Sequence, residues 1–285
     1  MKVRAMVCHA PGAALVAEEL NLAPPGPGEV LIEIMASGLC HSDLGQIEGT
    51  AAPFPFPIVV GHEGAGIVRA LGPCVTGLAE GDHVVPLSLA ECGACPACLS
   101  GRTNLCDRFM ASLGQQNARF SLNGQPVHTY AGVGSLAQFI VMPEINVARI
   151  RQDTPFDLAC LIGCAVATGV GAALHTARVE PGSSVAVFGL GGIGLNVVQG
   201  ARLAGASTII GVDRNPARAE IGQTFGLTHF IDPAGQDPVT AIRALTVGGA
   251  DHTFECVGNT VVMQQALSAT RPGWGCCTVL GVPAD

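Results

Sequence analysis

The sequence predicts an α/β protein with two domains, a β-rich N-terminal half followed by a doubly wound parallel sheet. Three observations lead to this prediction: a length of 285 residues, short alternating strands between breakers in the first half, and regular alternation of strand and helix after residue 182. Because only 13% of the residues are charged and 38 are glycine, a disordered or coiled-coil chain is excluded.

The N-terminal half is predicted to contain short strands joined by turns. Residues 29–35 (EVLIEIM) alternate apolar and polar side chains directly after the breaker cluster PPGPG, as a half-buried strand does. Residues 66–71 and 82–86 indicate two further short strands.

The C-terminal half alternates strands with helices. A continuous apolar strand at 184–188 precedes a glycine-punctuated helix that reaches about residue 204, and 238–245 is a further helical stretch. The other expected strands are 208–212, 229–231, 253–256 and 276–280. Such alternation implies a parallel sheet with helices on both faces, and it places the domain boundary within residues 160–182.

Two uncharged stretches, 158–174 and 183–201, raise the question of a membrane span. Several glycines interrupt each stretch, and so neither is read as a spanning helix. The N-terminus lacks the apolar core of a signal peptide, and a net charge of −8 argues against a nucleic-acid partner. We therefore expect a cytoplasmic protein with neither a membrane nor a nucleic acid as its partner.

Residues 189–194 (GLGGIG) fit the dinucleotide fingerprint GxGxxG, directly after a predicted strand and at the start of a predicted helix. Glycines let the backbone approach a pyrophosphate, and a helix N-terminus offers it unpaired N–H groups. The alternative is a plain glycine-rich turn. The residues expected to contact the cofactor are Gly189, Gly191, Gly192, Ile193 and Gly194.

Asp213 ends the next predicted strand, 19 residues after the last fingerprint glycine. An acid at this spacing accepts hydrogen bonds from the ribose diol and repels a 2′-phosphate, which favours NAD over NADP. The nearby Arg214 and Arg218 leave dual cofactor use open.

Four cysteines within 15 residues follow the pattern C-x2-C-x2-C-x7-C. Four thiolates can surround one tetrahedral zinc and leave no position for a substrate, which predicts a structural zinc site. The alternative is buried or disulfide-bonded cysteines, but twelve cysteines in a chain without an export signal favour metal or thiol chemistry. The four residues are Cys92, Cys95, Cys98 and Cys106.

Three further segments carry metal-binding residue types: CHSD at 40–43, GHE at 61–63 and GC at 163–164. Taken singly, each has an ordinary explanation. Cys164 reads as a small core residue, His62 as a turn histidine and Glu63 as a surface acid. Spacing alone does not join these segments into one site.

Seven segments of the chain together resemble one known family. They are GLCHSD, GHEGAGIV, GDHVVPL, ECGACPACLSGRTNLC, LIGCAVATGVGA, VAVFGLGGIGLNVV and DRNPAR. The segments occur in the order found in that family and are distributed along nearly the whole chain. In them the sequence resembles the zinc-dependent alcohol dehydrogenases of the medium-chain dehydrogenase family, in the class III-like branch. The resemblance implies NAD-dependent interconversion of a primary alcohol and an aldehyde.

The resemblance also implies a domain organisation. Residues 1–165 would form a GroES-like, zinc-binding catalytic domain whose C-terminal portion is missing, and residues 166–285 a Rossmann domain for NAD with five of six strands. In the strand order 3-2-1-4-5-6 the fifth strand then lies at the edge of the sheet, where it invites irregular association. A full-length relative would be a homo-oligomer.

The resemblance assigns roles around two zinc ions, a catalytic and a structural one. Asp43 matches a residue that orients a histidine ligand, Glu63 matches the acid behind the catalytic zinc, and Ser42 matches the hydroxyl that takes the proton of the alcohol onward. The implied ligands of the catalytic zinc are Cys40, His62 and Cys164.

Other roles implied by the resemblance concern the cofactor. His41 stands where the family uses a basic residue against the pyrophosphate, Thr168 lies near the nicotinamide and Arg218 near the adenosine ribose. Gly45 replaces a histidine that passes the proton to solvent in many relatives. We expect the proton to leave through the ribose hydroxyl and water, with help from His41.

The substrate pocket departs from the class III pattern. Residues 51–53 (AAP) replace acidic residues, and Met110 stands where an arginine would hold the glutathione carboxylate. The pocket positions are Ser88, Tyr130 and Ala131, which predict a roomy, largely apolar pocket for a primary alcohol or aldehyde, bulky or aromatic ones included.

Three alternatives stay open at this point. The chain could be an S-(hydroxymethyl)glutathione (formaldehyde) dehydrogenase, or a truncated chain that binds zinc and NAD without catalysis. A zinc-free quinone reductase of the same superfamily is disfavoured because both zinc motifs are present.

Overall fold

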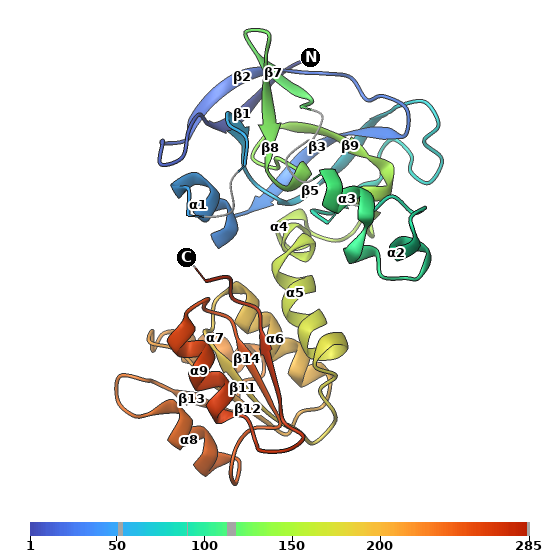
Figure 1. Cartoon of the computed structure of the whole chain (residues 1–285). Coiled ribbons are helices and arrows are strands. Elements are labelled where there is room, and N and C mark those ends of the chain that lie inside the picture. Colours follow the sequence, from blue (N-terminus) through green and yellow to red (C-terminus); the bar gives the residue numbers. More distant parts are fainter. Residues whose placement is uncertain (51–53, 90, 113–117, 284–285) are drawn as a thin grey trace. The chain divides into compact units, whose positions relative to one another are not determined.

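The computed structural model describes residues 1–50, 54–89, 91–112 and 118–283. The chain divides into two compact units, Met1–Cys164 and Ala165–Asp285 (Figure 1). Each unit contains hydrophobic core clusters of its own, and each is described by itself below.

The first unit contains a closed five-stranded barrel and a five-stranded antiparallel sheet. The barrel has the order β1 (Lys2–Cys8), β2 (Val16–Leu22), β7 (Phe120–Leu122), β8 (Gln125–Thr129) and β4 (Ile58–Val59). The sheet has the order β10 (Val147–Arg149), β6 (His83–Pro86), β5 (Glu63–Leu71), β3 (Glu29–Gly38) and β9 (Phe139–Pro143). Residues such as Val7, Leu20, Ile32 and Phe120 fill a shared core between them.

Pairing between β3 and β5 decides where the predicted strands end. The expected strand at 29–35 continues to Gly38, and the strand expected at 66–71 begins earlier, at Glu63, because Gly38 and Glu63 are partners in the register. This pairing buries Glu63, which is 2% exposed, so the reading of Glu63 as a surface acid was wrong.

The helices of the first unit are short. They are α1 (His41–Glu48), α2 (Pro96–Leu99), α3 (Asp107–Ser112) and α4 (Phe156–Ala159). Four 3-10 turns complete the unit: Thr103–Leu105, Tyr130–Gly132, Glu144–Asn146 and Cys160–Gly163.

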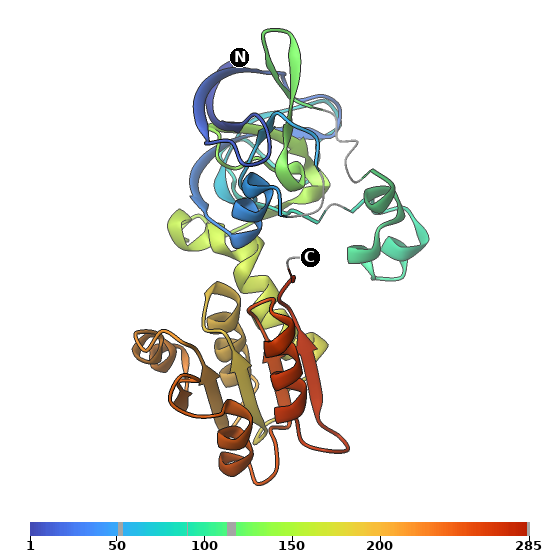
Figure 2. The same cartoon turned by 60° about the vertical axis from the view of Figure 1, so that its left-hand side comes forward.

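The second unit is the predicted doubly wound parallel sheet. Its order is β13 (His229–Ile231), β12 (Thr208–Val212), β11 (Ser184–Phe188), β14 (His252–Glu255) and β15 (Cys276–Val279). The strand order and the edge position of the fifth strand are as expected, although β14 begins and ends one residue earlier than predicted. Figure 2 shows these strands side by side, with α9, in red, against one face.

Helices cover both faces of this sheet because side chains alternate along each strand. Val185 and Val187 pack with α6, whereas Ala186 and Phe188 pack with α8 and α9. The helices are α5 (Ala165–Gly171), which runs into a π-turn at Ala172–Thr176, α6 (Gly192–Leu203), α7 (Arg218–Phe225), α8 (Pro238–Leu245) and α9 (Thr260–Ala269).

In the part of the chain that the structure describes, no single helix has both the length and the apolarity of a membrane span. The bent pair of helical segments Phe156–Gly163 and Ala165–Thr176 has the length and apolarity of a span only when the two segments are taken together.

Candidate functional site

The turn between β3 and α1 places a cysteine at a helix N-terminus. Cys40 is the N-cap of α1, and its backbone N–H donates to Oδ2 of Asp43 at 3.1 Å, one half of a capping box. The unpaired N–H groups and positive potential of a helix N-terminus favour a thiolate there. The local sequence therefore forms the helix and favours the thiolate form of Cys40 at the same time.

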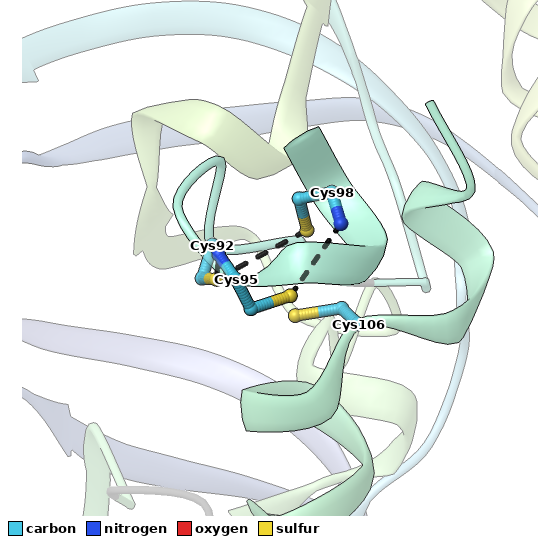
Figure 3. A group of neighbouring side chains, drawn as sticks. All are labelled: Cys92, Cys95, Cys98 and Cys106. Atoms are coloured by element: carbon cyan, nitrogen blue, oxygen red, sulfur yellow. Dashed lines mark hydrogen bonds between the residues drawn. The ribbon is translucent and has the colours of Figure 1, made fainter. Parts of the chain in front are cut away.

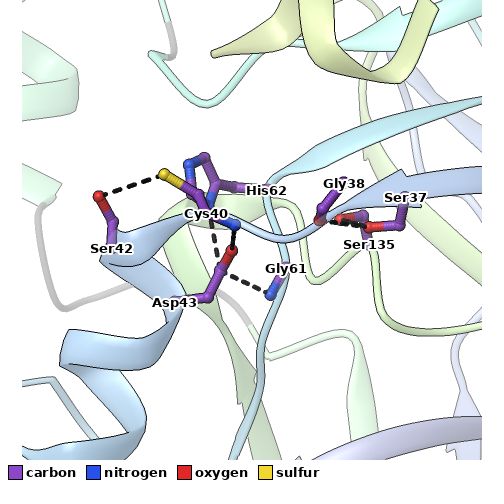
Figure 4. Close-up of polar contacts among 8 residues, drawn as sticks. All are labelled: Ser37, Gly38, Cys40, Ser42, Asp43, Gly61, His62 and Ser135. Carbon is purple, nitrogen blue, oxygen red and sulfur yellow. Dashed lines mark hydrogen bonds and ion pairs between the residues drawn. The ribbon is translucent and has the colours of Figure 1, made fainter. Parts of the chain in front are cut away.

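Asp43 joins this helix to the segment that carries His62 (Figure 4). Its Oδ1 accepts a hydrogen bond from the backbone N–H of Gly61 at 3.0 Å and lies 3.0 Å from Nδ1 of His62. The Asp43 side chain is nearly fully buried. Because Nδ1 is engaged by the carboxylate, Nε2 is the imidazole nitrogen that remains for a metal.

Segments that are far apart in the sequence meet at this point. One ligand atom from each of Cys40, His62, Glu63 and Cys164 lies within 4.8 Å of the others. Two thiols and an imidazole are a donor set that suits zinc, and a carboxylate beside them can complete or replace one bond. The residues present therefore fit the zinc ion that the family resemblance implies.

Hydrogen bonds within this group strongly shift the pKa values of its members. The bond from Cys164, with further bonds from His62 and Ser42, lowers the pKa of Cys40 to about 3 against the effect of burial. The same pairing raises the pKa of Cys164. Burial lowers the pKa of His62, but its bonds to Asp43 and Cys40 outweigh that effect and raise it to about 10. A cation that binds here would displace these protons.

An aromatic side chain borders the group. The Tyr130 ring meets the His62 ring edge-on, with centroids 5.5 Å apart, and Phe54 meets Tyr130 in the same way at 5.9 Å. Burial raises the pKa of Tyr130 to about 12. The sequence alone does not single out Phe54, because nothing in its segment PFPFP indicates that it lies beside Tyr130.

The remaining predicted residues of this unit have different surroundings. Ser42 lies beside the group, with its Oγ 3.6 Å from Sγ of Cys40. Ala131 shares the turn of Tyr130 and adopts a positive φ of 51°, and Ser88 is half-buried two residues beyond the end of β6. His41 is exposed on the first turn of α1. Residues 51–53 and the Met110 side chain lie outside the described parts.

The second cysteine group is compact as well (Figure 3). One sulfur atom from each of its four members lies within 4.8 Å of the others. Backbone N–H groups donate to three of these sulfurs: Cys95 N to Cys92 at 3.3 Å, Cys98 N to Cys95 at 3.5 Å and Phe109 N to Cys106 at 3.4 Å. Such bonds stabilise thiolates, so this group fits a tetrahedral zinc with four sulfur ligands.

In the second unit the fingerprint forms the turn between β11 and α6. Gly189 adopts a φ of +89°, and a side chain at Gly194 would collide with the carbonyl oxygen of Gly189. A Cβ on Gly191, the N-cap of α6, would meet nothing within 4 Å. The turn therefore leaves open space at a helix N-terminus, which fits the pyrophosphate of a dinucleotide.

Asp213 lies against this turn. Its Oδ2 accepts from the backbone N–H of Leu190 and its Oδ1 from that of Asn215, each at 2.8 Å. The carboxylate thus joins the end of β12 to the fingerprint. Arg218 begins α7, a few residues further along the chain, and Thr168 lies on α5. Gly169, next to Thr168, packs directly on the backbone of Ile193 and Val197 in α6.

Comparison with known proteins bears on the whole chain. Residues 26–152 match the family described as alcohol dehydrogenase GroES-like domain, and residues 192–285 match the family described as zinc-binding dehydrogenase. The chain is 48% identical over 296 residues to the "Alcohol dehydrogenase class-3" of Cereibacter sphaeroides, covering 99% of this chain and 79% of the relative. The chain belongs to the zinc-dependent medium-chain alcohol dehydrogenase family, in its class III-like branch.

Other members of the family are similar over the same length. An "S-(hydroxymethyl)glutathione dehydrogenase" of Paracoccus denitrificans is 47% identical, with 99% of this chain and 79% of the relative covered. Among solved structures, the benzyl alcohol dehydrogenase of Acinetobacter calcoaceticus has a TM-score of 0.93 at 34% identity and covers all of this chain and 78% of its own. The GroES-like domain followed by a Rossmann-like domain is thus confirmed, and zinc and NAD are consistent with the family.

Proposed function

We propose that the chain interconverts primary alcohols and aldehydes with NAD, at the group formed by Cys40, His62 and Cys164. The observation that carries the proposal is the meeting of two thiols and one imidazole from three distant segments. We assign these three residues as ligands of a catalytic zinc, and the other four cysteines as ligands of a structural zinc. When bound, the catalytic zinc supplies a Lewis acid that makes the hydroxyl group of the alcohol more acidic.

The protein's own residues then handle the proton and orient the site. Ser42, beside Cys40, accepts the hydroxyl proton and passes it on. Asp43 keeps the His62 ring in one tautomer and one orientation, which holds the ligand geometry constant during turnover. Gly45 offers no side chain to the proton, so the proton leaves through the ribose hydroxyl of the cofactor and water, with help from His41.

NAD supplies the hydride acceptor, and the second unit binds it. We assign the pyrophosphate to the fingerprint residues Gly189–Gly194, including Gly191, Gly192 and Ile193, with His41 as its basic partner. Asp213 and Arg218 bind the adenosine ribose, and Thr168 lies near the nicotinamide. On this assignment residues 1–165 form the catalytic domain and residues 166–285 the NAD-binding domain.

The substrate class follows from the aromatic pair beside the metal site. Phe54 and Tyr130 offer an apolar, aromatic surface next to His62, and Ser88 and Ala131 have small side chains. We therefore favour primary alcohols with an apolar or aromatic substituent. S-(hydroxymethyl)glutathione is the second candidate, because relatives about 47% identical carry that substrate in their names.

The two candidates are separated by comparing kcat/KM for benzyl alcohol, ethanol and S-(hydroxymethyl)glutathione with NAD. Benzyl alcohol is expected to be used best, and ethanol less well because it leaves the aromatic surface in contact with water. A clear preference for the glutathione adduct would establish the second candidate. Zinc and NADH binding without turnover of any of these alcohols would instead support a chain that binds without catalysis.

We further propose a cytoplasmic location and, as the resemblance implies for a full-length relative, association into a homo-oligomer. Twelve free thiols agree with a reducing compartment. In the part of the chain that the structure describes, β15 is an edge strand, and an edge strand offers backbone groups for association. Analytical ultracentrifugation of the purified chain tests the second point, and a strictly monomeric species would contradict it.

A further inference from the structure

A buried glutamate ends the strand next to the fingerprint. Glu255 is the last residue of β14, which pairs in parallel with β11, and its side chain is fully buried. Its Oε1 accepts hydrogen bonds from three successive backbone N–H groups: Val257 at 2.9 Å, Gly258 at 2.8 Å and Asn259 at 3.5 Å. One carboxylate oxygen therefore binds three consecutive N–H groups of the turn at residues 256–259.

This turn packs against the first glycine of the fingerprint. The backbone N–H of Cys256 donates to the carbonyl of Phe188 at 2.9 Å, directly before Gly189. A Cβ placed on Gly189 would stand only 2.7 Å from Cγ2 of Val257. The Val257 side chain, which is 54% exposed, therefore lies beside Gly189 and offers an apolar surface to whatever binds at the fingerprint.

The other carboxylate oxygen of Glu255, Oε2, has no stabilising contact among the described residues. Oε2 is buried and has no hydrogen-bond partner among them, and a Cβ on Gly281 would stand 2.6 Å away from it. A buried carboxylate oxygen without a partner costs stability. The three N–H groups that donate to Oε1 offset this cost, and they define the position of the turn.

We propose that Glu255 is a positioning residue for the cofactor: it fixes the turn at 256–259 so that Val257 forms one wall of the dinucleotide site beside Gly189. The inference rests on the proposed binding of NAD to the fingerprint. Without the carboxylate, the three N–H groups need other partners, the turn moves, and Val257 no longer lies beside Gly189.

The experiment compares the Kd of NADH, by fluorescence titration, for the unaltered chain and three variants. Glu255→Ala removes the acceptor, and Glu255→Gln keeps an amide oxygen that can still accept the N–H groups. Asp251→Asn is the matched control, because Asp251 lies directly before the opposite end of β14 and also accepts a backbone N–H, that of Ser184 at 2.8 Å. Unfolding midpoints of all four proteins are measured in parallel, and the titrations are made well below them.

We expect Glu255→Ala to raise the Kd of NADH about tenfold, Glu255→Gln to restore most of the affinity, and Asp251→Asn to lower the unfolding midpoint with the Kd unchanged. A Kd for Glu255→Ala within twofold of the unaltered chain would overturn the inference while NAD binding stands. So would an equal loss of affinity in Asp251→Asn, since it would show that any weakening of the sheet has this effect. If the unaltered chain does not bind NADH, the proposed function fails together with this inference.

Discussion

At the scale of single residues, Asp43 connects a helix cap to the proposed metal site. One of its oxygens accepts from the N-cap of α1, and the other faces Gly61 and His62. The orientation of the imidazole thus depends on a side chain that also starts a helix. Removal of a carboxylate that holds a metal-binding histidine typically lowers metal affinity by about 10- to 100-fold.

We predict that Asp43→Ala weakens zinc binding at the catalytic group by about tenfold or more, because His62 loses the bond that fixes its tautomer. Zinc per chain, measured after dialysis against a graded series of chelator concentrations, gives the affinity. Asp153→Asn is the control, because Asp153 pairs with Arg151 at an exposed position. Equal zinc retention in Asp43→Ala and the control would show that Asp43 does not orient a ligand.

Asp251 supplies a second prediction at this scale, on pH dependence. Burial opposes ionisation of Asp251, but bonds from Ser184 and Arg271 outweigh it and lower its pKa to about 2. A carboxyl with a depressed pKa stabilises the fold above its unfolded value near 3.8, and that contribution is lost as the pH falls towards 2. After allowance for partial exposure, the contribution is about 1–2 kcal/mol at neutral pH.

Asp251→Asn is therefore expected to lower the free energy of unfolding of the second unit at pH 7. Urea unfolding at pH 7, 4 and 2.5 provides the measurement. The gap between variant and unaltered chain should shrink as the pH falls through this range. A gap that stays constant with pH would mean that the Asp251 charge contributes nothing.

At the scale of elements, we expect the lobe of α2, α3 and the four cysteines to depend on the proposed structural zinc. The two helices have four and six residues, too few to be stable in water by themselves. The apolar side chains of Leu99 and Leu105 are largely exposed, so the lobe has little core of its own beyond the buried sulfurs of Cys95 and Cys106. The sulfur group is the feature that can hold it together.

We predict that Cys98→Ser removes one zinc per chain and makes the lobe the first site of proteolytic cleavage. Metal analysis and limited proteolysis with mass spectrometry test this, with Cys74→Ser as control because Cys74 is exposed and lies outside both sulfur groups. NADH binding should be the same in both variants. Two zinc ions per chain in Cys98→Ser would contradict the structural assignment.

Elements also show what the sequence could and could not predict. The strands of the second unit were predicted within a residue or so, because each is a short apolar run between breakers with a helix after it. The barrel was not predicted: β4 has two residues, and β2 pairs with β7, about a hundred residues further along the chain. Pairings of this kind leave no periodic signal within a short window.

The site shows the same division. The fingerprint and the four-cysteine pattern are local, and the sequence predicted both groups. Cys40, His62 and Cys164 were joined only by family resemblance, since nothing in their spacing brings them together. Phe54 was missed because its contact with Tyr130 joins residues that are distant in the sequence. Glu255 was missed because its partners are backbone N–H groups of a turn, and a pattern of residue types does not indicate such bonds.

At the scale of the whole molecule, the two units have separate cores. Val7, Leu20 and Phe120 belong to a cluster of the first unit, and Val185 and Phe254 to one of the second. The proposed zinc sites use only residues of the first unit, whereas the fingerprint and Asp213 belong to the second. Ligands should therefore stabilise the units selectively.

We predict that NADH at 100 times its Kd stabilises the second unit by about 2.7 kcal/mol, and the first unit, which contributes His41 to the proposed cofactor site, by much less. Chelation of zinc should do the reverse and destabilise only the first. Calorimetry follows both transitions. One cooperative transition that responds equally to both ligands would contradict independent units.

The thiol groups make the metal-free protein sensitive to oxidation. The structure describes all twelve cysteines, and each is a free thiol. The sulfurs of Cys92 and Cys98 lie 4.0 Å apart, so little movement separates them from covalent oxidation. A bound zinc would then act as a chemical protecting group, because it occupies the lone pairs that an oxidant attacks. A chain stripped of metal in air is therefore expected to form disulfides and to bind zinc again only after reduction, whereas the same chain stripped under a reductant binds zinc directly.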